Sequence, residues 1–170
     1  MPNKSLRVQN APPSPRPMRL LRGTRSLLSV AVSFRSFLAL AVRAGLLQEL
    51  DGDEVFLVLA PTEAAFANLP RKLSHGLFMG PLELAFEIAE HHLIRGGSLD
   101  PGLQATLQGE SLLVRSPRVG VARIAGLPRV CRNGLLVPVD QVLVPRWGSK
   151  ASDTVRLRRF LAEGELAATG

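Results

Sequence analysis

The stretch that most constrains the fold is VFLVLAPTEAAFANL, which occupies residues 55–69. Its first five residues are apolar, rich in strand-forming side chains and too few for a globular helix, so they predict a buried strand over residues 55–59. Pro61 is expected to end this strand, because proline has no N–H for the ladder. Thr62 can then cap a new helix, and Glu63 lies at its first position, where a carboxylate meets the positive end of the helix dipole. We therefore expect a strand–corner–helix unit around which the rest of the chain packs.

Helices are predicted on both sides of this unit. Before it, the apolar residues that recur at helical spacing are Phe37, Leu38, Ala41 and Val42. After it, residues 68–80 contain one proline and two glycines, which predict a loop with about one helical turn. Pro81 can open the next helix at its first position. The apolar stripe expected on that helix consists of Leu82, Ala85, Phe86 and Ala89.

From residue 99 onward the pattern changes to short strands. They are predicted over residues 104–107, 111–115, 119–124, 129–131 and 135–144. Asn133-Gly134 is the strongest hairpin signal in the chain. Pro138 lies inside the last predicted strand and indicates a bulge or a sheet edge there. Helices first and strands later, without βαβ alternation, are typical of an α+β fold.

Four of these segments resemble the signatures of the fasciclin-like domain family. FLVLAPTEAAF, residues 56–66, is similar to the first signature, and NGLLVPVDQVLVP, residues 133–145, is similar to the second. Between them, EHHLIRGGSL (residues 90–99) and TLQGESLLV (residues 106–114) resemble the family's histidine-bearing helix end and its central hairpin. The resemblance implies N-terminal helices packed on a twisted wedge of short strands.

The resemblance also implies which residues carry the family motifs and are candidates for contacts with a partner. They are Pro61, Thr62, Glu63, His91, His92, Asn133, Gly134 and Asp140. His92 corresponds to the histidine of the family's Tyr-His motif, and His91 stands where the tyrosine usually is. We interpret His92 as a core histidine hydrogen-bonded to the strand–helix corner, with a place in an adhesive surface as the alternative.

The chain departs from the family pattern at two places. Residues 127–130 read Leu-Pro-Arg-Val where many members carry an Asp-Ile pair implicated in receptor recognition, and Val137 replaces a histidine often found in the last strand. Integrin-type adhesion through those residues is therefore not expected.

Charge is distributed unevenly over three predicted segments. Residues 1–25 carry six basic side chains, five prolines and no acid, and we expect a disordered basic arm. Residues 26–145, the predicted fasciclin-like domain, carry ten basic and eleven acidic side chains. Residues 146–170 carry five basic and three acidic ones and are expected to form a linker and a short amphipathic helix. The net charge of +7 therefore resides in the two ends.

A targeting segment is an alternative interpretation of the N-terminal region. Residues 19–25 would be its basic part and residues 27–34 its short apolar part. Arg35 interrupts the apolar run, and the same residues resemble the opening helices of the family. The sequence has no uninterrupted apolar run of about 20 residues, the length that a membrane helix needs.

Motifs typical of hydrolases, nucleotide sites and zinc sites are absent from the sequence, including GxSxG, HExxH, the Walker loop, GxGxxG and paired CxxC. His91 and His92 are adjacent and point in different directions, so they do not readily ligate one ion. Cys131 is interpreted as a small buried hydrophobe, with a reactive thiol beside Arg129 and Arg132 as the alternative. We expect no catalytic site, no cofactor and no metal.

The function that the resemblance implies is non-enzymatic binding or adhesion to a protein or polysaccharide surface. It also implies an extracellular or envelope location, with a cytoplasmic location as the alternative because no clear signal peptide is present. A nucleic-acid or polyanion binder acting through the basic ends is a second hypothesis. A carrier of an apolar ligand such as a carotenoid is a third. The residues expected to share one core are Phe56, Val58, Phe66, Leu93, Leu136 and Val142.

Overall fold

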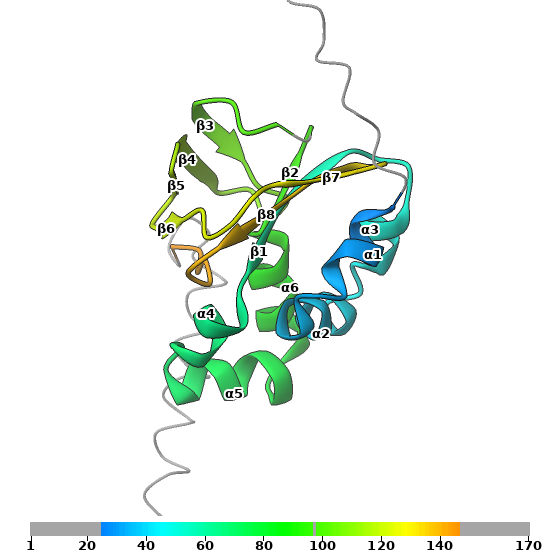
Figure 1. Cartoon of the computed structure of the whole chain (residues 1–170). Coiled ribbons are helices and arrows are strands. Elements are labelled where there is room, and N and C mark those ends of the chain that lie inside the picture. Colours follow the sequence, from blue (N-terminus) through cyan, green and yellow to red (C-terminus); the bar gives the residue numbers. More distant parts are fainter. Residues whose placement is uncertain (1–24, 97, 147–170) are drawn as a thin grey trace, which may run out of the picture.

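The computed structural model describes residues 25–96 and 98–146, and within them helices lie on one side of two small sheets (Figure 1). The helices are α1 (Leu27–Ala31), α2 (Arg35–Arg43), α3 (Leu47–Asp51), α4 (Glu63–Ala67), α5 (Arg71–Met79) and α6 (Leu82–Glu90). The strands are β1 (Phe56–Pro61), β2 (Leu93–Arg95), β3 (Gly102–Ala105), β4 (Ser111–Arg115), β5 (Arg118–Val119), β6 (Ala122–Arg123), β7 (Arg129–Cys131) and β8 (Gly134–Val139). The expected α+β fold is confirmed.

The strands form two four-stranded sheets of different construction. The central sheet has the order β2-β1-β8-β7, and β1 and β8 run parallel from the pair Phe56–Gly134 to the pair Pro61–Val139. The meander sheet has the order β3-β4-β5-β6, and its neighbours are all antiparallel. Parallel pairing of β1 and β8 brings the two signature segments side by side.

The central sheet is the middle of three layers. Every residue of β1 is buried, and its side chains alternate between two cores. Phe56 and Val58 belong to the core beneath the helices, whereas Leu57 and Leu59 belong to the core beneath the meander sheet. All six residues expected to share one core do so, in the core beneath the helices.

The strand–corner–helix unit is present, with one difference at its corner. Thr62 is the N-cap of α4, and its Oγ1 accepts a hydrogen bond from the N–H of Ala65 at 3.2 Å. Pro61 is the last residue of β1 rather than the residue that stops it. Pro61 has no N–H to donate, but the N–H of the next residue, Thr62, donates to the carbonyl of Val139 at 3.0 Å and continues the pairing of β1 with β8.

The prediction of a loop over residues 68–80 was wrong. Residues Arg71–Met79 form α5, with Pro70 before its first turn and Gly80 after its last. Gly76 lies inside this helix and is buried together with Leu77. Burial of that face outweighs the roughly 1 kcal/mol that an interior glycine costs a helix.

The buried stripe of α6 is also different from the predicted one. Ala85 and Ala89 are buried as expected, but their buried companions are Leu84 and Ile88. Leu82 and Phe86 are 59% and 42% exposed. The helix is apolar around most of its circumference, so spacing alone left two overlapping stripes, and packing selected the one that includes Ile88.

Several strand boundaries differ from the prediction. The segment predicted over residues 119–124 is a hairpin of β5 and β6, the first predicted strand begins earlier at Gly102, and the last one ends at Val139. Pro138 lies within β8, which is flanked by β1 and β7. β7 pairs only as far as Leu136, and beyond it the N–H of Ala125 donates to the Pro138 carbonyl at 2.8 Å, so Pro138 is bonded there through its carbonyl.

The predicted basic arm over residues 1–25 and the predicted linker and helix over residues 146–170 lie outside the described residues, apart from Arg25 and Arg146. In the described part of the chain, no helix is both long enough and apolar enough to span a bilayer.

Candidate binding surface

Glu63 connects the corner after β1 to the first helices. Its Oε1 accepts a hydrogen bond from the backbone N–H of Ser36 at 2.9 Å, and its Oε2 accepts one from the Ser36 hydroxyl at 2.6 Å. These two bonds lower the pKa of the Glu63 carboxyl. Since Ser36 lies in the first turn of α2, the carboxylate also faces the positive end of that helix. Glu63 therefore fastens α4 to α2.

His92 is a completely buried histidine that connects α6 to the segment after β8. Its Nδ1 lies 2.7 Å from the carbonyl oxygen of Ile88, and its Nε2 lies 3.0 Å from the backbone N of Leu143. The carbonyl can only accept and the N–H can only donate, so the ring is neutral with its proton on Nδ1. Burial lowers the pKa of His92 to about 4, and the neighbouring His91 adds to that effect. The partner at Nε2 is Leu143, not the strand–helix corner.

His91 faces a different region. It is buried at the end of α6, and its Nδ1 lies 3.4 Å from the hydroxyl of Thr106. That hydroxyl donates to the carbonyl of Glu110 at 2.8 Å. Burial lowers the pKa of His91, and the charge of Glu110 opposes the shift. The two histidines thus serve two separate contacts, and no group of three metal-ligating side chains exists among the described residues.

Asn133 and Gly134 also have roles inside the fold. Asn133 is 1% exposed; its Oδ1 accepts from the N–H of Leu27 at 2.8 Å and its Nδ2 donates to the carbonyl of Leu50 at 2.9 Å. At Gly134 a Cβ would overlap the carbonyl oxygen of Phe56. The register of β7 and β8 makes Arg132 and Asn133 the turn, and Gly134 begins β8. The predicted Asn-Gly turn is therefore shifted by one residue.

Asp140 joins the two sheets at the end of β8. Its Oδ1 accepts from the backbone N–H of Arg123 at 2.7 Å, and its own N–H donates to the Arg123 carbonyl at 3.0 Å. Cys131 is buried, and burial raises the pKa of its thiol. That shift does not favour a reactive thiolate.

The predicted site residues therefore do not gather on one surface. They occur at the α4 corner, at the end of α6, at the β7–β8 turn and at the end of β8. Five of the eight are buried, namely Pro61, His91, His92, Asn133 and Gly134, and the side chains of the three polar ones have hydrogen-bond partners within the fold.

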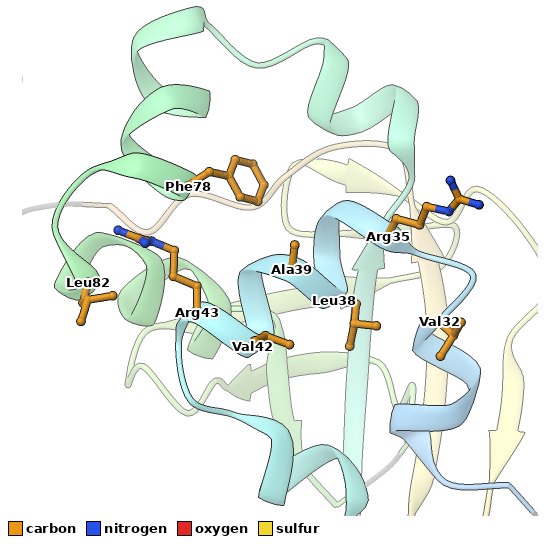
Figure 2. A pocket seen from close by; sticks show the side chains of 8 residues that line it. All are labelled: Val32, Arg35, Leu38, Ala39, Val42, Arg43, Phe78 and Leu82. Carbon is orange, nitrogen blue, oxygen red and sulfur yellow. The ribbon is translucent and has the colours of Figure 1, made fainter.

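An open groove was not predicted from the sequence. It has a volume of about 810 Å³ and lies between α2, α5 and the start of α6 (Figure 2). Its lining residues are Val32, Arg35, Leu38, Ala39, Val42, Arg43, Phe78 and Leu82. Sequence reasoning missed it because α5, which supplies Phe78, was expected to be a loop.

The lining of the groove is apolar with a basic margin. Val32, Val42 and Leu82 are 60%, 51% and 59% exposed. Figure 2 shows Phe78 extending from α5 over α2 and Arg35 at the other end of the groove. The guanidinium of Arg43 donates a hydrogen bond to the carbonyl of Gly80, the C-cap of α5. Such a surface can receive an apolar side chain and pair with a carboxylate beside it.

Comparison with known proteins gives consistent matches. The profile of the Fasciclin domain matches residues 32–145. Periostin from Homo sapiens is 28% identical over 124 residues, which are 65% of this chain and 14% of periostin. Protein sll1483 from Synechocystis sp. is 27% identical over 122 residues, which are 66% of this chain and 68% of that protein. The chain thus spans only a small part of the length of periostin.

Proposed function

This chain belongs to the Fasciclin domain family, and from that premise we propose that it is a non-enzymatic module that binds a partner protein in the groove between α2, α5 and α6. Modules of this family commonly serve adhesion or protein binding. The corresponding place of action is a cell envelope or an extracellular matrix.

The observation that carries the proposal is the exposure of large apolar side chains along the groove. Val42 and Leu82 are more than half exposed, although each lies on a helix whose opposite face is buried. Contiguous exposed apolar surface of this kind is typical of interaction sites rather than of a bare monomer surface. The centre of a protein interface is built from such residues, with arginine enriched around it.

The chemistry of the groove also indicates what the partner presents. Arg35 is exposed at the groove, and its charge acts on the nearby Glu63 carboxylate, whose two oxygens accept hydrogen bonds from Ser36. Among the described residues no carboxylate lies within ion-pair distance of Arg35. A planar guanidinium binds carboxylates well. We therefore expect a partner segment with an apolar anchor residue next to an aspartate or a glutamate.

Site-specific photo-crosslinking tests the proposal. A photo-reactive amino acid at Val42 is expected to yield a protein adduct in an extract of the native cell surface. The same amino acid at Leu47, which is 38% exposed on α3 and does not line the groove, is the matched control. Unlabelled protein should compete for the adduct, whereas Leu82→Asp should compete at least about tenfold less well, because it places a charge in the apolar centre.

Leu82→Asp is suited to this use because an acidic residue at a helix N-terminus favours the helix, so the variant should fold. Equal adducts from both positions, or equal competition by Leu82→Asp, would show that the groove is not the binding site.

Carriage of an apolar ligand is the second candidate function, favoured by the volume and apolar lining of the same groove. Pockets for small ligands occupy roughly 300–1,000 Å³, and this groove has about 810 Å³. A carried pigment or lipid should stay with the purified protein and appear on extraction into organic solvent. Its loss in Leu82→Asp would support carriage, and an extract without apolar compounds would argue against it.

A further inference from the structure

The outward face of the meander sheet carries one row of arginines and one row of apolar side chains. We propose that this face binds the surface of a membrane that contains anionic phospholipids. The meander sheet and the helices lie on opposite sides of the central sheet (Figure 1), so this inference does not depend on the groove.

The basic row consists of Arg115, Arg118 and Arg123. Arg115 pairs directly with Arg118 across β4 and β5, and Arg118 pairs directly with Arg123 across β5 and β6. Residues paired in this way project from the same face of a sheet, and all three are exposed. Neighbouring strands are about 4.8 Å apart, so the three side chains start from one short line across the sheet.

These arginines are not neutralised by the described part of the protein. Ion pairs within it involve Arg95 and Arg132, not this row. Asp140 is bonded to β6, but its Oδ1 accepts from the backbone N–H of Arg123. Like charges directly opposite each other lower the stability of a sheet. An anionic surface placed against the row removes that repulsion.

The apolar row lies next to the basic one. Leu103 and Leu113 are directly opposite each other on β3 and β4, and they are 75% and 50% exposed. Leu113 precedes Arg115 by two residues on the same strand, so both project from the outward face. Val121, in the turn between β5 and β6, is 64% exposed, and the N–H of its neighbour Gly120 donates to the Leu113 carbonyl at 2.9 Å.

The two rows together favour a lipid surface over a soluble polyanion. Basic side chains are attracted to anionic headgroups, and apolar side chains beside them enter the boundary between headgroups and acyl chains. A nucleic acid or an acidic polysaccharide would contact the arginines and leave the leucines in water. Residues 102–123 also contain no aromatic ring on which bases could stack.

Sedimentation of the full chain with lipid vesicles tests the proposal. The chain should bind vesicles of phosphatidylglycerol and phosphatidylcholine and should bind pure phosphatidylcholine much more weakly. Arg118→Glu is expected to reduce binding to the anionic vesicles by about tenfold or more. Arg71→Glu, at an exposed position on α5, makes the same change in net charge and should alter binding by less than about threefold.

The basic side chains of residues 1–25 and 146–170 are present in every variant, so differences between variants report on the folded face. Arg118→Glu creates opposite charges beside Arg115 and Arg123 and should melt no earlier than the parent protein, which separates lost binding from misfolding.

A second variant distinguishes lipid from other polyanions. Leu113→Thr keeps a strand-forming residue but removes apolar surface, and it should weaken vesicle binding severalfold while leaving binding to heparin unchanged. If Leu113→Thr bound vesicles like the parent protein, or if Arg118→Glu and Arg71→Glu bound equally, the proposal would be wrong. The first result would indicate an acidic polymer as the ligand, and the second would assign binding to the basic ends.

Discussion

The central sheet and the meander sheet differ in how many of their faces are covered. Every residue of β1 is buried, because the helices cover one face of the central sheet and the meander sheet covers the other. Residues of β4 are alternately exposed and buried, because nothing among the described residues covers the outward face of the meander sheet. Side chains of the central sheet must therefore fit against packed neighbours on both faces. Outward side chains of the meander sheet have no such neighbours and are available for binding.

The largest predicted effect tests how closely β8 approaches β1 in the central sheet. Gly134→Ala should destabilise the protein by more than about 4 kcal/mol or prevent folding, because a Cβ would overlap the Phe56 carbonyl between β8 and β1. Gly109→Ala is the matched control in the β3–β4 turn, where φ is also positive but no atom lies within 4 Å of a Cβ. Its cost should be about 1–2 kcal/mol. Denaturant melts that give similar costs for both would contradict the close approach of β1 and β8.

Replacing a side chain by alanine should cost much more stability in the central sheet than on the open face of the meander sheet, although both costs are smaller than that of Gly134→Ala. Phe56 is fully buried in β1, and Phe56→Ala should cost about 3–5 kcal/mol of unfolding free energy. Leu103 is 75% exposed on β3, and Leu103→Ala should change stability by less than about 0.5 kcal/mol. A cost above about 2 kcal/mol for Leu103→Ala would mean that the outward face of the meander sheet is covered in the full chain.

The pH dependence of stability should report the burial of His92. Its pKa is about 4 in the folded protein against an ordinary value of 6.5. The unfolded chain therefore binds a proton between these values and the folded chain does not. The free energy of unfolding is therefore unaffected by His92 well above pH 6.5, and protonation of this residue in the unfolded chain lowers it by about 3 kcal/mol as the pH falls to about 4. His91, whose pKa is also lowered, adds loss of the same sign.

Two substitutions test whether His92 causes this loss of stability at low pH. His92→Gln should remove much of it, because an amide can still donate to the Ile88 carbonyl and accept from the Leu143 N–H without titrating. His75→Gln alters an exposed histidine and should leave the decline unchanged. The measurement is the free energy of unfolding at about pH 7.5 and at about pH 4.5. A full decline in His92→Gln would assign it to other groups.

Sequence reasoning located β1 and β8, the two middle strands of the central sheet, because each contains a continuous apolar run beside residues typical of turns and caps. Strand β2, which follows α6 after two residues, was not predicted. The run before Pro61 and Thr62 and the run after Asn133-Gly134 each predicted a strand that is present, although their boundaries moved. The six core residues were expected together because the two signature segments lie close in space in the family that they resemble, and all six share one core. The α5 helix was missed because Gly76 was taken as a helix breaker, and only the packed structure shows that position to be buried.

The candidate surfaces were much harder to predict. Each of the three arginines of the meander sheet is unremarkable in sequence, and counting charges over residues 26–145 gave a nearly neutral domain. Strand register places Arg115, Arg118 and Arg123 side by side. The exposed Leu82 was a visible signal, but helical spacing assigned it to the core. Surfaces formed by register or by neighbouring helices depend on tertiary structure, which local patterns do not contain.

The smallest predicted effect is a gain in stability on the open face. Arg118→Glu replaces two like-charge neighbours with two opposite-charge neighbours, Arg115 and Arg123, so it should stabilise the protein by about 0.5 kcal/mol at low salt. The gain should fade in about 1 M salt, where charges are screened beyond roughly 3 Å. Ala105→Glu is the control, because Ala105 lies on the same face opposite the uncharged Ser111.

Urea melts of these two variants in low and high salt decide the point. A gain in Arg118→Glu that is absent in Ala105→Glu and lost in salt would show that repulsion within the row weakens the free protein. Equal melts would show that the three guanidinium groups avoid one another in solution, and the row would then have no repulsion for an anionic surface to relieve. In the central sheet, by contrast, replacing a buried residue such as Phe56 with a charged one should never raise stability, because both faces of that sheet are covered. A residue whose replacement stabilises the fold but weakens membrane binding is thus expected only on the open face.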